Sequence, residues 1–160
     1  MYRSTAEFIN ARQKFCNWKL EVRSVRNQGG RSPNKCYMNS REAKLNEDNV
    51  WMIAGWLIMP YNQKTNSTEI IQHWWNGKGH NEQFDTTDHC LDAGPEYVQD
   101  LSYFSFCMDY DAKLTSHVSS SLLLRDGEFV AVDECSDGSI AHRKIANLSC
   151  EELFKTKMLR

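Results

Sequence analysis

The chain has 160 residues, of which 41% are hydrophobic and 25% are charged, and its formal net charge is −2. This composition is typical of a globular protein and excludes a disordered chain, and the length fits one domain, which we expect to span residues 1–160. With 19 basic and 21 acidic residues there is no general positive field, so we expect no nucleic-acid partner. The longest apolar run, residues 50–60, falls short of the roughly 20 residues that cross a bilayer, so we expect no membrane association.

The first ten residues include Arg3 and Glu7 and contain no apolar segment of the kind found in signal peptides. We therefore expect a cytoplasmic protein whose six cysteines are thiols rather than a disulfide framework. No two cysteines stand in a C-x-x-C pair, which disfavours a zinc ribbon. The sequence gives no indication of the oligomeric state.

Elements in the first third of the chain follow from apolar spacing and turn chemistry. Apolar residues at helical spacing predict a helix over residues 4–18, with a Ser-x-x-Glu capping box at its start. Turn-forming residues predict a loop over residues 27–34. Good helix formers then predict a second helix over residues 37–47, which places Cys36 where the loop enters the helix.

The middle of the chain is predicted to form strands. Residues 50–59 and 68–75 are rich in Val, Ile and Trp, and the polar segment between them joins them as a hairpin. An Asn-Gly-Lys-Gly sequence at residues 76–79 predicts a tight turn that leads into a short strand over residues 82–86.

The last third is predicted to contain two helices and a hairpin. Residues 95–106 are predicted to be helical, with Pro95 in the first turn. Strands over residues 120–124 and 128–133 form a hairpin, and Ser149 caps a final helix that ends at about residue 158. This order of elements predicts an α+β fold, with helices packed on an antiparallel sheet, rather than a parallel doubly wound sheet.

Three residues carry the chemistry of a thiol nucleophile. Such a nucleophile needs a favoured thiolate, an adjacent base and a third group that orients the base. Cys36 at a helix N-terminus has a favourable dipole and unpaired backbone N–H groups that can face an oxyanion. His73 and Asp85 lie on consecutive strands either side of a tight turn, so we expect them to lie nearly opposite each other on one face. Asp85 can then orient the imidazole while its other nitrogen faces Cys36.

The motifs around these residues resemble those of transglutaminase-like proteins in the papain-like superfamily. The successive motifs are Cys36 in Lys-Cys-Tyr-Met-Asn, Gly55-Trp56 in a strand, His73-Trp74-Trp75-Asn76 at a strand end, and Phe84-Asp85-Thr86-Thr87 on the next strand. The resemblance covers roughly residues 30–90. It implies a papain-like or transglutaminase-like domain with Cys36 as nucleophile, His73 as general base and acid, and Asp85 as orienter.

The resemblance leaves the substrate class open. Tyr37 directly follows the nucleophile, where the family often has a small residue, and Asp88 stands where a proline is common. The family includes peptidases, amidases, deamidases, transglutaminases and members without activity. The expected partner is thus a protein, a peptide or a small amide or thioester substrate. The alternative is a non-catalytic binding, inhibitor or effector protein on the same scaffold.

Four further residues are candidates for substrate binding or for the oxyanion site: Gln28, Tyr37, Trp74 and Asn76. Papain-like enzymes use a glutamine upstream of the cysteine as an oxyanion donor, although the spacing of Gln28 differs from the usual one. Trp74 and Trp75 must point to opposite faces of a strand, so one is expected in the core and the other can shield the thiolate from water.

A metal site is the other possibility in this region. His80, His89 and Cys90, together with Asp85 or Asp88, are metal-ligand types within a short span. Their spacing matches no closed zinc site, and surface loops often collect such residues. We therefore expect neither a metal nor a cofactor.

Overall fold

The computed structural model describes residues 1–33, 35–88, 94–109, 121–135 and 137–158. In these residues the helices are α1 (Arg3–Gln13), α2 (Cys36–Asn46), α3 (Leu101–Asp109) and α4 (Cys150–Met158). The strands are β1 (Glu21–Arg23), β2 (Arg26–Arg31), β3 (Val50–Ile58), β4 (Thr68–Lys78), β5 (Glu82–Thr87), β6 (Glu96–Gln99), β7 (Ser121–Arg125), β8 (Glu128–Glu134) and β9 (Ile140–Lys144). The protein is thus mixed α and β, with helices packed on a mostly antiparallel sheet, as the sequence predicts.

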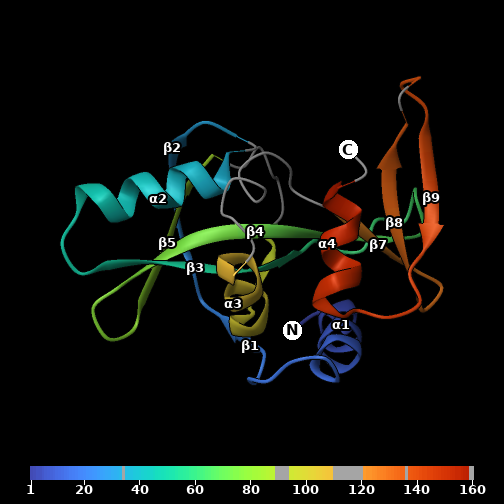
Figure 1. Cartoon of the computed structure of the whole chain (residues 1–160), viewed down its shortest axis with the longest axis horizontal. Coiled ribbons are helices and arrows are strands. Elements are labelled where there is room, and N and C mark those ends of the chain that lie inside the picture. The colour runs from blue at the N-terminus through green and yellow to red at the C-terminus, as the bar shows by residue number, and fades with distance from the viewer. Residues whose placement is uncertain (34, 89–93, 110–120, 136, 159–160) are drawn as a thin grey trace.

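The sheet branches at its central strand. Its main path runs β1-β6-β3-β4-β7-β8-β9. One edge of β4 pairs with β3, and the other edge is shared, because β7 pairs with residues 68–71 and β5 pairs with residues 76–78. On its other side, β5 pairs in parallel with β2. In Figure 1, β3 and β4 cross the molecule, with α2 over one end and the β8–β9 hairpin at the other.

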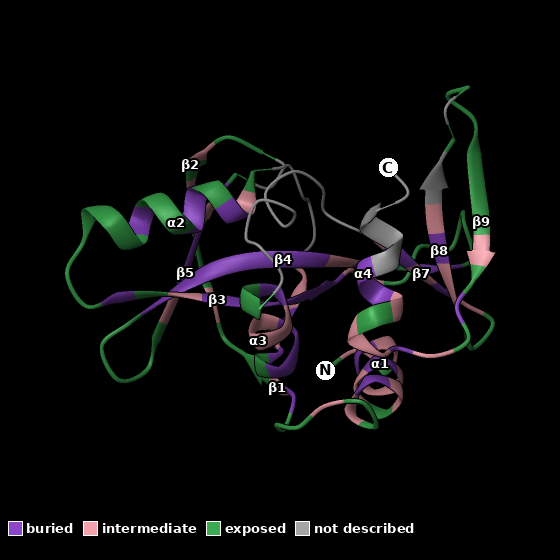
Figure 2. Ribbon diagram, viewed as in Figure 1, coloured by how far each residue is buried: buried purple, intermediate pink, exposed green. Residues whose placement is uncertain are grey.

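Side chains from β4 enter two cores because successive residues of a strand point to opposite faces. Trp74 belongs to the larger core, which α1, α3 and α4 also line through residues such as Phe8, Tyr103 and Leu153. Trp75 belongs to a smaller cluster on the other face, with Ile53, Leu57 and Tyr97. Figure 2 shows β4 buried along most of its length.

A buried ion pair holds the helices to the sheet. Arg12 Nε donates to Asp100 Oδ2 at 2.9 Å, and both side chains are fully buried. The same carboxylate accepts from Trp56 Nε1 at 3.0 Å and from the Tyr103 backbone N–H at 2.8 Å. Arg12 Nη1 also donates to the Leu148 carbonyl at 3.0 Å. The pair thereby joins α1, β3, the start of α3 and the segment that leads into α4.

The first helix is shorter than predicted. It ends at Gln13, whose side chain donates to the Trp18 carbonyl and accepts from the Leu20 N–H, so the chain turns away from the helix axis. The predicted capping box is also wrong, because Glu7 instead accepts from Arg3 Nε at 2.8 Å within the helix.

The predicted loop over residues 27–34 is largely a strand. β2 pairs in parallel with β5 at Asn27↔Asp85, and its register shifts before Arg31↔Thr87. Gly29 and Gly30, with φ of 60° and 87°, allow this bulge because they carry no Cβ. Turn-forming residues therefore marked a bulge inside a strand rather than a loop.

The predicted helix over residues 95–106 divides into β6 and α3. The first part inserts between β1 and β3, where Tyr97 and Val98 supply the aromatic and β-branched side chains that suit a sheet. Asp100 then caps α3 by accepting the Tyr103 N–H. Tertiary pairing has overridden the local helical preference.

Other predictions are confirmed in the described residues. The strands over residues 50–59 and 82–86 appear as β3 and β5, and the hairpin turn between β7 and β8 has positive φ at Asp126 and Gly127. The strand predicted over residues 68–75 appears as β4 but continues to Lys78, because residues 76–78 pair with both β3 and β5, so the tight turn predicted at residues 76–79 lies instead at residues 79–81. Ser149 Oγ accepts the Glu152 N–H at the start of α4. Thiols rather than disulfides are present at Cys16, Cys107, Cys135 and Cys150, whereas Cys90 lies outside the described residues. Within the described part of the chain, no helix combines the length and apolarity needed to span a membrane.

Candidate active site

Cys36 is the first residue of α2, as the helix prediction requires. The Asn39 N–H donates to the Lys35 carbonyl at 2.9 Å and closes the first helical turn. The thiol is partly buried, packs against the larger core, and interacts with His73, whose pKa it raises. The nucleophile candidate and the base candidate therefore interact at the end of α2 where backbone N–H groups have no intrahelical acceptor.

His73 and Asp85 meet across the point where β5 separates from β4. His73 Nε2 lies 2.6 Å from Asp85 Oδ2, and the two side chains are 4% and 1% exposed. The register Asn76↔Phe84 means that a continued ladder would place Asp85 opposite Trp75. His73 is therefore the diagonal neighbour of Asp85 on the same face rather than its direct partner. The two residues are close, as expected, but they are not directly opposite each other in the ladder.

Asp85 is held by donors from two further elements. Tyr97 OH donates to Oδ2 at 2.9 Å, and the Thr87 N–H donates to Oδ1 at 2.9 Å. Burial, followed by the negative charge of Asp85, raises the pKa of Tyr97, so its hydroxyl stays a donor. Tyr97 was missed at the sequence level because its contact depends on the long-range pairing of β6.

The environment of His73 favours its charged form. Burial by itself lowers the pKa of His73, but its interactions with Cys36 and Asp85 outweigh burial and raise this pKa to about 10. The imidazole is consequently protonated at neutral pH. Since the attraction between charges is mutual, an imidazolium next to a thiol favours the thiolate.

The Gly-Trp and His-Trp-Trp motifs have a packing explanation. Gly55 pairs with His73 across the β3–β4 ladder. A Cβ on Gly55 would overlap the Val98 carbonyl oxygen and would lie 2.6 Å from Cη2 of Trp75. Trp75 in turn stacks on His73, with ring centroids 6.3 Å apart and planes 16° apart. Glycine is therefore needed for Trp75 to cover the imidazole.

Tyr37, Trp74 and Asn76 seat α2 on the sheet. The buried rings of Tyr37 and Trp74 make an edge-to-face contact with centroids 5.1 Å apart. Asn76 is fully buried, and its Nδ2 donates to the Ser40 carbonyl at 2.9 Å, while Ser40 Oγ donates to the Trp75 carbonyl at 2.8 Å. These contacts fix the position of Cys36. Direct contact of the three predicted residues with a substrate stays a prediction.

The glutamine candidate, Gln28, lies on β2, and the Asp-x-Thr motif lies on β5. Gln28 is exposed in the bulge of β2, between the positions that pair with Asp85 and Thr87. Thr87 Oγ1 accepts from Asn39 Nδ2 at 3.2 Å, which ties the first turn of α2 to β5. An oxyanion role for Gln28 stays a prediction.

The metal-ligand residue types of this region are not gathered into one site in the described part of the chain. Among the described residues, no group of three His, Cys, Asp or Glu side chains is placed to hold a metal ion. His80 is exposed in the turn between β4 and β5, and His89 and Cys90 lie outside the described residues. Asp85 is engaged with His73 and Tyr97 instead.

Comparison of the chain with protein-family models, with curated proteins and with solved structures found no match. A thiol, an imidazolium and a carboxylate in series, next to a helix N-terminus, can attack an electrophilic carbon, protonate a leaving group and stabilise an oxyanion.

Proposed function

We propose that the protein is a papain-like, transglutaminase-type thiol enzyme that hydrolyses or transfers the acyl group of an amide, peptide or thioester. Cys36 is the nucleophile, His73 the general base and acid, and Asp85 the orienter. The observation that supports this most is the buried His73, whose Nε2 lies 2.6 Å from Asp85 Oδ2 and whose pKa is raised by its interactions with both Cys36 and Asp85.

The proposed reaction proceeds through a thioester. The Cys36 thiolate attacks the substrate carbonyl, and the oxyanion that forms faces the N–H groups of the first turn of α2. His73 gives its proton to the leaving amine or thiol as the carbon–heteroatom bond breaks. Neutral His73 then takes a proton from water or an acceptor amine as that group attacks the thioester, and the thiolate is released. Throughout, Asp85 keeps the imidazole in one orientation.

Thiol reactivity tests the proposal, and the chain provides a matched control. Cys150 is also the first residue of its helix and is also partly buried, and it accepts a hydrogen bond from Arg12 Nη2 at 3.0 Å. Burial raises the pKa of Cys150. It thus reproduces the helix position of Cys36, with a guanidinium in place of the imidazole.

We expect iodoacetamide at pH 7 to alkylate Cys36 at least tenfold faster than Cys150, measured by mass spectrometry of the native protein. His73→Ala should reduce the rate at Cys36 to about that of Cys150, because the thiolate loses its cation. Circular dichroism provides the folding control. Equal rates at the two thiols in the unmodified protein would refute the proposal and favour a binding protein on the same scaffold.

A further inference from the structure

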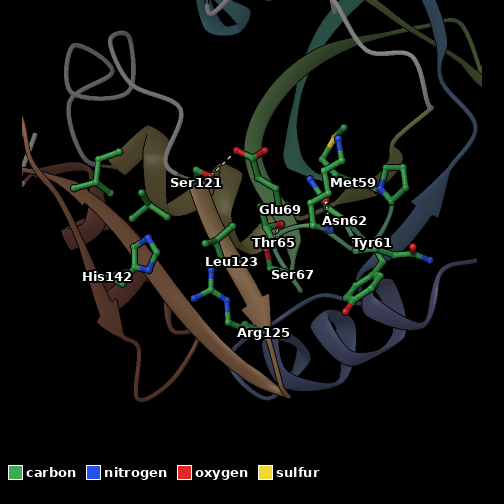
Figure 3. A pocket seen from close by; sticks show the side chains of 15 residues that line it. Met59, Tyr61, Asn62, Thr65, Ser67, Glu69, Ser121, Leu123, Arg125 and His142 are labelled. Carbon is green, nitrogen blue, oxygen red and sulfur yellow. Dashed lines mark hydrogen bonds between the residues drawn. The ribbon is translucent and has the colours of Figure 1, made fainter.

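A groove crosses the face of the sheet at the end away from α2. It has a volume of about 920 Å³, and we call it the sheet-face groove. Residues 59–65 form one wall, β9 forms the other, and side chains of β4, β7 and β8 form the floor. Figure 3 shows Tyr61 on the first wall, His142 on the second, and Leu123 and Arg125 between them. This volume suits several residues of a bound chain.

The walls and floor of the sheet-face groove are partly apolar. Tyr61 is 56% exposed and Ile140 is 68% exposed, one on each wall. Leu123 and Val132 lie between them on the floor. Tyrosine and exposed aliphatic side chains around a hollow are typical of surfaces that bind proteins. A chain that lies between these walls would bury both exposed side chains.

The charged groups of the sheet-face groove favour an anion. Among the described residues, neither Arg125 nor Lys64 has a carboxylate partner, and Arg125 Nε is buried without an acceptor. The lining also holds one carboxylate, that of Glu69, which accepts from Ser121 Oγ at 2.8 Å, so the two cations outnumber it. A ligand carboxylate would supply the acceptor that the planar guanidinium lacks.

One residue of the sheet-face groove and one residue of the candidate active site point to the same face of β4. Glu69, which lines the groove, and His73 are four residues apart and therefore point to the same side of the strand. At about 3.3 Å per residue they are separated by roughly 13 Å. An extended polypeptide covers that distance with about four residues. A segment bound in the groove can therefore extend along β4 toward His73.

We propose that the sheet-face groove binds an extended polypeptide segment that carries a carboxylate side chain, and that the substrate of the enzyme is accordingly an acidic polypeptide. The second clause rests on the proposed function. The first does not, because none of the groove contacts involves Cys36.

Fluorescence anisotropy tests the binding with Cys36→Ser protein, so that no turnover occurs. The probes are two labelled peptides of about ten residues, long enough to span the groove and reach His73. Apolar residues alternate with glutamate in one and with lysine in the other. We expect only the glutamate peptide to bind, and we expect Arg125→Gln to weaken its binding at least tenfold. Arg23→Gln, on β1 at the opposite edge of the sheet, should leave the binding unchanged.

Lys64→Gln, at an exposed position, provides a second variant that should weaken binding and fold normally. Equal binding of both peptides, or unchanged binding by the folded Arg125→Gln and Lys64→Gln variants, would overturn the proposal. So would competition by free acetate at the concentration of the peptide, which would show a site for small anions. The binding assay does not use the thiol, so a negative binding result does not affect the alkylation test of the proposed function. Likewise, a negative alkylation result does not affect the binding proposal.

Discussion

Asparagine in place of Asp85 removes the negative charge beside His73 while it keeps the size of the side chain. The hydrogen bond that loses its charge is 2.6 Å long and joins two side chains that are 4% or less exposed. Hydrogen bonds to charged groups contribute about 1.5–3 kcal/mol, and one pKa unit corresponds to about 1.4 kcal/mol. We therefore expect the pKa of His73 to fall by about one to two units from its value of about 10.

The direction of this shift follows from the charges. The carboxylate stabilises the imidazolium, so its loss favours the neutral ring, and burial continues to act in the same direction. The thiolate–imidazolium pair is therefore destabilised, relative to the neutral thiol and imidazole, by the same free energy that the lost charge contributed. Alkylation of Cys36 at pH 7 should therefore slow by up to about 100-fold. The difference should disappear at high pH, where every accessible thiol is ionised.

NMR titration of the His73 Cε1 proton and the pH profile of Cys36 alkylation measure the two effects separately. Asp137→Asn is the matched control, because it removes a carboxylate from an exposed turn before β9. If folded Asp85→Asn protein titrates His73 at the same or a higher pH than the unmodified protein, the electrostatic account of the site is wrong.

Three other substitutions probe the surroundings. Tyr97→Phe removes a donor from Asp85 Oδ2, so the pKa of the histidine should rise in NMR titration, opposite in sign to Asp85→Asn, at a stability cost of about 1 kcal/mol. Gly55→Ala should destabilise the protein by more than about 2 kcal/mol in urea unfolding because its Cβ overlaps the neighbouring strand, whereas Gly94→Ala, which meets nothing within 4 Å, should change stability by less than about 0.5 kcal/mol. Arg12→Leu should cost about 3–5 kcal/mol in the same assay because it leaves the Asp100 carboxylate buried and uncompensated, and a loss below about 1 kcal/mol would contradict that ion-pair assignment.

Local sequence was sufficient where the determining contacts are local. The helix formers after Cys36 define α2, and a tight turn between β4 and β5 brings His73 near Asp85 within twelve residues of chain. The positive φ at Gly127 accompanies the hairpin turn that its sequence predicts. Such features depend on backbone preferences within a few residues, which can be read from one sequence.

Local sequence failed where distant pairing decides the structure. Tyr97 lies in a segment whose local pattern favours a helix, yet the segment becomes β6 because β1 and β3 accept it on both sides. The bulged β2 likewise depends on parallel pairing with β5. Alternation placed Trp74 and Trp75 on opposite faces, but only the docking of α2 determines that Trp74 lies in the core and Trp75 covers His73.

The short strand β6 makes the site and the core mechanically dependent on each other. Tyr97 in β6 steadies Asp85 on one face of the sheet, and Asp100, three residues later, anchors the Arg12 ion pair on the other. A one-residue slip of this strand would turn every side chain to the wrong face and would break both contacts at once. The two contacts therefore belong to a single cooperative unit that opens and closes together. A substitution that destabilises α1 can therefore alter the environment of the Cys36 thiol without contacting it.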